Sequence, residues 1–280
     1  MNSWYRAFAA RLRHDLARER VRPGAGAWLL SGALGFALAA LGLWLQGGYH
    51  AAFTPLHTLL TRLPDDLWAL LSSLGYENLA LTGVLVAAPR HPRFLWILLW
   101  TAVVDLAFTQ GLKYGLDLTR PPGVMADLRV VGPHLVRHGF PSGHTGLAFA
   151  VAGSALAFTR SARGRAGWLL LALGVGLSRV AVGVHWPLDV LVGAAGGLAS
   201  AWAGLRLTQR FGDGPTPAAT LALLLLLAVF PLRILNGQTG GFSPLDPLLH
   251  LLALAGLGAT AAALLSIGDR SPAPPTGAGG

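Results

Sequence analysis

The chain has 280 residues, of which 53% are hydrophobic and only 12% are charged, a composition typical of a polytopic membrane protein and not of a soluble domain. The absence of cysteine excludes disulfides, thiolate metal sites and cysteine nucleophiles. In a soluble protein the net charge of +9 would suggest nucleic acid, but here it indicates membrane topology and an anionic substrate, and we expect no nucleic-acid partner.

Long apolar segments predict an all-α, polytopic transmembrane helical bundle. A bilayer core of about 30 Å needs about 20 helical residues to cross it. Candidate spans lie at 27–46, 67–88, 94–117, 143–160, 166–183, 187–207, 217–233 and 247–267. We predict eight spans, with six as the alternative because the last two could be peripheral. Residues 1–26 are then a cytoplasmic basic tail, 27–268 the transmembrane domain with its motifs in 75–207, and 269–280 a disordered tail rich in Pro and Gly.

Basic residues predict the orientation, because short loops rich in Lys and Arg stay in the cytoplasm. After the N-terminal tail, such residues cluster at every second boundary between spans, at positions 90–93, 160–165 and 206–210. This spacing predicts a multi-pass membrane protein with a cytoplasmic N-terminus. The loops 47–66, 118–142, 184–186 and 234–246 would then face the outer side. A cleavable signal peptide is the alternative for the first span.

Three polar clusters lie at the outer-side ends of predicted spans, and the first is KYGLDLTRPP. Lys113 and Arg120 are seven residues apart, about two helical turns, so both cations can share one face if the helix continues that far. Pro121 and Pro122 end the helix. The alternative is a snorkelling lysine and an unrelated arginine at the membrane edge.

The second cluster is GFPSGHTG, directly before an apolar run. Pro141 and Ser142 are typical of a helix start, so free backbone N–H groups and the positive end of the helix dipole would face the outer side as an anion site. Gly143 lets an oxyanion approach the backbone closely. His144, in the first turn, could give or take a proton beside that anion. The alternative is a capped helix with an interfacial histidine.

The third cluster is SRVAVGVHWPLD. His185 and Asp189 are four residues apart, so on a helix the carboxylate can accept a hydrogen bond from one imidazole nitrogen and leave the other as a nucleophile. Pro187 suits the first turn of the following span. Arg179 adds a third cation whose planar fork fits phosphate oxygens. The alternative is a loop histidine followed by an aspartate that starts a helix.

Together the clusters supply two histidines, one carboxylate and three cations at the same side of the membrane. Three cations and a helix N-terminus make an oxyanion trap, and a histidine nucleophile inside it predicts phosphoryl transfer through a phosphohistidine. The set lacks the grouped carboxylates that hold Mg²⁺ or Ca²⁺. We therefore expect catalysis without a metal or any other cofactor.

The motif order Lys-x6-Arg-Pro, Pro-Ser-Gly-His and Ser-Arg-x5-His-x3-Asp resembles the type 2 phosphatidic acid phosphatase superfamily of membrane lipid phosphatases. The resemblance implies that His185 attacks phosphorus, that Asp189 orients it, and that His144 protonates the leaving group and later activates water. The groups implied to hold the phosphate are Lys113, Arg120, Ser142, the Gly143 amide and Arg179. The substrate would be a lipid phosphate such as undecaprenyl diphosphate, phosphatidylglycerophosphate, phosphatidic acid or a lipid A phosphate. The resemblance also implies a bacterial inner membrane, with the active site at its periplasmic face.

Two other functions stay open at this point. A lipid phosphotransferase would pass the phosphoryl group to a lipid or sugar acceptor, and a lipid-binding or transport protein would carry a degenerate pocket. Asp105, in the middle of a predicted span, could steer Lys113 or have a packing role, and Glu77 could be interfacial. The loop cations Arg129 and Arg137 could bind a second phosphate or be solvated. The sequence indicates neither the oligomeric state nor a role for 217–267.

Overall fold

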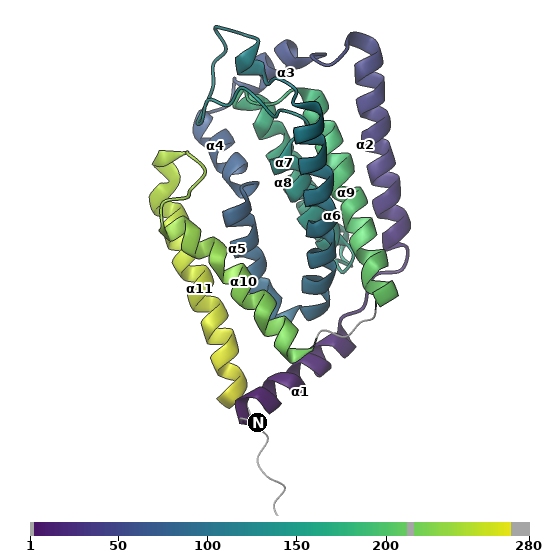
Figure 1. Ribbon diagram of the computed structural model, residues 1–280, viewed down its shortest axis with the longest axis vertical. Coiled ribbons are helices and arrows are strands. Elements are labelled where there is room, and N and C mark those ends of the chain that lie inside the picture. The colour runs from purple at the N-terminus through teal and green to yellow at the C-terminus, as the bar shows by residue number, and fades with distance from the viewer. Residues whose placement is uncertain (1–2, 212–215, 270–280) are drawn as a thin grey trace, which may run out of the picture.

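The computed structural model describes residues 3–211 and 216–269, and these residues form helices and loops without a strand. Most helices run alongside one another in a bundle, and α1 lies across one end of it (Figure 1). The expected disordered tail lies outside the described residues from position 270 onward. The α-helices are α1 Ser3–Arg18, α2 Ala25–Gly47, α3 Phe53–Leu60, α4 Asp65–Leu74, α5 Glu77–Ala87, α6 Pro92–Leu116, α7 Gly143–Leu156, α8 Ala162–Ala181, α9 Pro187–Phe211, α10 Pro217–Leu235 and α11 Asp246–Asp269, and the short 3₁₀ helices are η1 Ala88–Arg90, η2 Pro121–Gly123 and η3 Ser243–Leu245.

The helical bundle is confirmed, and the structure gives each predicted span a helix or a bent pair of helices. Within the described residues, five helical segments are long and apolar enough to cross a membrane: α2, α6 with η2, α9, α10 and α11 with η3. The bent pair of α4 with α5 and η1 brings the count to six. The other two predicted spans correspond to α7, which has only 14 residues, and α8, which carries arginines near both ends. By length and composition, five or six segments of the described residues could therefore cross a membrane, and the count of eight stays a prediction.

Helix α9 is the centre of the bundle, with α2, α6 and α7 packed around it. Its glycines allow this close approach. A Cβ atom at Gly193 would lie 2.7 Å from the carbonyl oxygen of Ser142, and one at Gly204 would lie 2.7 Å from the carbonyl oxygen of Ile97. Small residues at helix contacts are typical of packing in lipid. The tight contact between α7 and α9 fixes the start of α7 against the start of α9.

The basic N-terminal region contains the amphipathic helix α1. Phe8 and Leu12 on one face are buried, and the Trp4 indole N–H donates to the carbonyl oxygen of Leu264 on α11 at 3.1 Å. Helix α1 therefore packs on the bundle at the end where α11 finishes, as Figure 1 shows.

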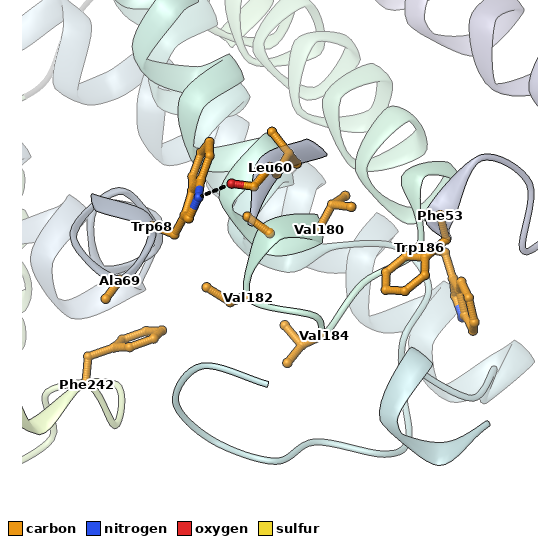
Figure 2. Close-up of a cluster of buried hydrophobic side chains, with 10 residues drawn as sticks. Phe53, Leu60, Trp68, Ala69, Val180, Val182, Val184, Trp186 and Phe242 are labelled. Carbon is orange, nitrogen blue, oxygen red and sulfur yellow. Dashed lines mark hydrogen bonds between the residues drawn. The ribbon is translucent and has the colours of Figure 1, made fainter. Parts of the chain in front are cut away.

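The α10–α11 hairpin packs against α5, away from the centre of the bundle. Its connecting loop reaches back to the opposite end from α1. There Phe242 is buried in a cluster with Trp68, Val182 and Val184, close to the segment that joins α8 to α9 (Figure 2). The role of 217–267 is thus partly structural, because the hairpin supports both α5 and the α8–α9 segment.

Candidate active site

The three predicted clusters meet at the end of the bundle opposite α1. The first cluster spans the end of α6 and the loop after it, the second starts α7, and the third joins α8 to α9 (Figure 1). The Ser142 amide donates to the carbonyl oxygen of Asp189 at 3.0 Å, which ties the second cluster directly to the third. Residues far apart in the sequence therefore surround one site.

His185 is held between a carboxylate and a guanidinium. Its Nδ1 lies 3.1 Å from Oδ2 of Asp189, which also accepts from the Trp186 amide at 2.9 Å, and its Nε2 lies 2.8 Å from Nη1 of Arg120. A guanidinium nitrogen can only donate, so Nε2 must carry the lone pair and Nδ1 the proton. Both His185 and Asp189 are buried. Burial, followed by the charges of Arg120 and Arg179, lowers the pKa of His185 well below 6.5, which keeps the imidazole neutral.

Tyr49 also binds this pair, and no motif in the sequence points to it. Its hydroxyl donates to Oδ1 of Asp189 at 2.6 Å, from the segment between α2 and α3. Burial, followed by the neighbouring charge of Asp189, raises the pKa of Tyr49, so the phenol stays protonated and continues to donate. The only available signal was a tyrosine just after the first span, and no motif links it to a residue 140 positions away.

Arg120 does not lie on a helix with Lys113, contrary to one premise of the prediction. Helix α6 ends at Leu116, because Asp117 adopts the left-handed conformation with φ of 43°. Arg120 enters the site from the following loop, where its guanidinium donates to the carbonyl oxygens of Arg137, His138 and Val184 at 2.8 to 3.1 Å. These backbone contacts hold the buried cation beside His185.

The other two cations are fixed at neighbouring helix ends. Arg179, near the end of α8, is buried and donates to the Ser72 hydroxyl, while its Nε has no hydrogen-bond partner among the described residues. Lys113, near the end of α6, donates through Nζ to the carbonyl oxygen of His138 at 3.3 Å. A Cβ atom at Gly143 would lie 3.8 Å from that Nζ, so the open face of Gly143 points to Lys113.

The start of α7 has the predicted capped geometry. The Ser142 hydroxyl accepts from the Thr145 amide at 3.4 Å and from the Thr145 hydroxyl at 2.9 Å, so its contacts in this structure are those of a helix cap. Gly143 and His144 form the first turn. The His144 ring stacks near that of Tyr76, with 6.2 Å between ring centroids. Tyr76 is thus a second aromatic neighbour of the site that the sequence did not indicate.

The loop cations are paired with carboxylates. Arg129 forms an ion pair with Asp65, and Arg137 forms one with Asp117. These contacts favour a structural role for the two arginines over a second phosphate site. Glu77 lies in the first turn of α5.

Asp105 is buried on α6 and is not placed against Lys113 by any described contact. Its carboxylate lies against α7, because a Cβ atom at Gly146 would be 3.3 Å from Oδ1 of Asp105. That oxygen has no hydrogen-bond partner among the described residues. The position agrees with a role at the packed contact between α6 and α7.

One family model and several known proteins match parts of this chain. The family model of the PAP2 superfamily matches residues 94–213. The chain is 37% identical over 82 residues to the bacitracin transport permease protein BcrC of Bacillus licheniformis, a match that covers 29% of this chain and only 39% of that relative. It is 29% identical over 156 residues to the undecaprenyl-diphosphatase of Sulfolobus acidocaldarius, which covers 54% of this chain and 72% of the relative.

Two further similarities are to a lipid A enzyme and to a solved structure. The chain is 30% identical over 161 residues to the lipid A 1-phosphatase of Rhizobium etli, covering 52% of this chain and 68% of the relative. The crystal structure of Aquifex aeolicus LpxE superposes with a TM-score of 0.50 at 25% identity, covering 54% of this chain and 93% of that one. All three motifs, from Lys113 to Asp189, lie inside the segment matched by the family model. On this evidence the chain belongs to the PAP2 superfamily.

Proposed function

We propose that this protein is an integral membrane phosphatase that releases inorganic phosphate from a lipid phosphate or diphosphate. The observation that carries the proposal is the arrangement at His185, whose Nδ1 faces Asp189 while its unprotonated Nε2 faces Arg120. Arg179, Lys113 and the first turn of α7 lie on neighbouring helix ends. A neutral nucleophile surrounded by fixed cations suits attack on an anionic phosphorus centre.

The proposed reaction has two steps. In the first, the substrate phosphate takes over the hydrogen bond that Arg120 makes to Nε2, and the freed lone pair forms an N–P bond while the P–O bond to the lipid breaks. His144 starts this step as an imidazolium, gives one proton to the departing lipid oxygen and becomes neutral. In the second step His144 takes a proton from water, whose oxygen bonds to phosphorus while the N–P bond breaks. Inorganic phosphate leaves, and His185 is neutral again.

Asp189 would stabilise the intermediate, because His185 becomes positively charged when it carries the phosphoryl group. Both oxygens of Asp189 already accept hydrogen bonds, from Tyr49 at Oδ1 and from Trp186 and His185 at Oδ2. Among the described residues, no group of histidines and carboxylates could hold a metal ion. This donor set supports a reaction without a divalent metal.

We further propose that eight segments cross a bacterial inner membrane, with α7 and α8 completing the bundle around α9. The basic residues at 90–93, 160–165 and 206–210 lie at helix ends away from the motif cluster. The positive-inside rule then puts α1 in the cytoplasm and the motif cluster at the periplasmic face. The names of the similar proteins, an undecaprenyl-diphosphatase and a lipid A 1-phosphatase, support a lipid phosphate or diphosphate as the substrate.

The test is phosphate release by the purified full chain from undecaprenyl diphosphate, phosphatidylglycerophosphate, phosphatidic acid and lipid A. His185→Ala and His144→Ala should abolish release at unchanged protein levels in the membrane. His14→Ala, at an exposed position on α1, is the matched control and should leave release unchanged. Wild-type turnover should persist in excess EDTA. Equal release by wild type and His185→Ala would refute the proposal, and loss of turnover in EDTA would refute its metal-free part.

A further inference from the structure

The second predicted span is broken beside the proposed proton donor. Helices α4 and α5 meet at a bend of 58° near Gly75. A Cβ atom at Gly75 would lie 3.1 Å from that of His144 and would collide with Val175. Helix α4, before the break, packs on α8. Helix α5, after the break, turns away and packs on α10 and α11. The bend therefore separates α5 from α8 on the side of His144 that faces α1.

A cavity of about 460 Å³ lies between α5 and α8, and residues of α7 line it between these two helices. We call it the α5–α8 groove. Its lining is apolar apart from Glu19, His91 and Thr159. Leu74 and Val175 line the end next to His144, while Phe158 and Trp168 line the end toward α1. The volume lies within the range of about 300 to 1,000 Å³ that small-molecule sites occupy.

The far end of the groove is closed by a polar pair. Oε1 of Glu19 lies 3.0 Å from Nδ1 of His91, and Oε2 accepts from the Arg93 amide at 2.6 Å, which caps the start of α6. Burial raises the pKa of Glu19. An apolar ligand that extends down the groove would meet these polar groups and stop there.

The apolar length of the groove matches that of one acyl chain. From Ala148 on α7 to Phe158, two residues beyond the end of that helix, the distance is about 15 Å at about 1.5 Å per residue. An acyl chain in one leaflet of a hydrocarbon core of about 30 Å also spans about 15 Å. The one helical turn from His144 to Ala148, about 6 Å, leaves room for the headgroup linkage between phosphate and chain.

We propose that the α5–α8 groove binds one fatty-acyl chain of the substrate, so that the enzyme selects acyl-chain lipid phosphates. This inference rests on the proposed function, because the phosphate must lie at His144 for the chain to enter the groove. A polyprenyl chain is several times longer than the groove, so most of that chain would have to lie outside it. The α10–α11 hairpin would contribute by holding α5 away from α8.

Gly83 gives a direct test, because it lines the groove and a Cβ atom there meets nothing within 4 Å. Gly83→Phe should fill the groove without disturbing the fold. We expect kcat/KM for long-chain phosphatidic acid to fall by about tenfold or more, because a displaced chain misplaces the phosphate. Short-chain phosphatidic acid and a polyprenyl phosphate should be hydrolysed at wild-type rates. Gly35→Phe, at an exposed and equally open position on α2, is the matched control and should change none of these rates.

A binding experiment separates this inference from the proposed function. His185→Ala is incubated with a phosphatidic acid that carries a photoreactive diazirine at the end of one chain, and the labelled residues are identified by mass spectrometry. Label should appear at the far half of the groove, at Phe158 or Trp168. Label confined to the exposed face of α2, or Gly83→Phe hydrolysing long-chain lipid as wild type does, would overturn the inference. Label in the groove, together with a wild-type protein that hydrolyses no lipid phosphate, would refute the proposed function but not the inference.

Discussion

Tyr49→Phe removes a single hydroxyl from the proposed catalytic centre. The hydroxyl donates to Oδ1 of Asp189 at 2.6 Å, and Asp189 is fully buried. Phenylalanine preserves the ring contacts with Phe140 and Trp186, whose centroids both lie 6.1 Å away. The substitution therefore isolates the hydrogen bond and leaves one carboxylate oxygen without its donor.

The size of the effect follows from that bond. A hydrogen bond to a charged group contributes about 1.5 to 3 kcal/mol, equivalent to about 10- to 150-fold if it acted wholly on the transition state. The bond also exists before reaction, and only its strengthening as His185 becomes positive affects the rate. We therefore expect kcat to fall by about tenfold, at the lower end of this range. KM should stay unchanged, because Tyr49 contacts Asp189 and not the predicted phosphate ligands.

The assay measures kcat and KM for phosphate release, together with thermal unfolding. Tyr5→Phe on α1 is the matched control and should behave as wild type. Tyr49→Phe should also lower the unfolding temperature, because a buried carboxylate oxygen loses its donor. An unchanged kcat would refute the positioning role, even if the variant proved less stable. A raised KM with unchanged kcat would indicate a role in binding instead.

Two further predictions concern the same centre. Because its surroundings lower the pKa of His185 well below 6.5, the imidazole should stay neutral as the pH falls through 6.5. Phosphate release should therefore persist at pH 6.5 and decline only at lower pH. A decline centred at or above pH 6.5 would contradict this prediction. Gly143→Ala puts a methyl group 3.8 Å from Lys113 Nζ, on the face where phosphate should approach. This substitution should lower kcat/KM by about tenfold or more without lowering the unfolding temperature, because the hydrogen-bond donors must lie within about 3 Å of the phosphate oxyanion. Wild-type kinetics would show that phosphate does not bind at this amide.

Much of the fold could be predicted because membrane helices have a length set by the bilayer. Each apolar run of the sequence corresponds to a helix or a bent pair of helices in the structure. The bend at Gly75 could not be predicted, because it depends on contacts with His144 and Val175 that only the folded bundle brings together. The short α7 likewise differs from an ideal span, and it is packed between α6, α8 and α9.

The candidate site was predicted where its members are close in sequence. The four-residue spacing of His185 and Asp189 predicted the hydrogen-bonded pair that the structure shows. Ser142 was likewise expected at a helix start. Arg120 reaches the site through a loop because Asp117 ends α6 early, which helical periodicity cannot indicate. Tyr49 was missed because a contact between residues 140 positions apart leaves no local pattern.

The most direct test of the central claim is to trap the phosphoryl group on His185. His144→Ala is mixed with p-nitrophenyl phosphate, whose leaving group needs no protonation, so that the first step proceeds while the second lacks its base. The reaction is quenched in alkali, which preserves phosphohistidine, and the peptides are sequenced by mass spectrometry. The account predicts phosphate on His185 and on no other residue. Phosphate on a different residue, or p-nitrophenol formed without any phosphorylated protein, would contradict it.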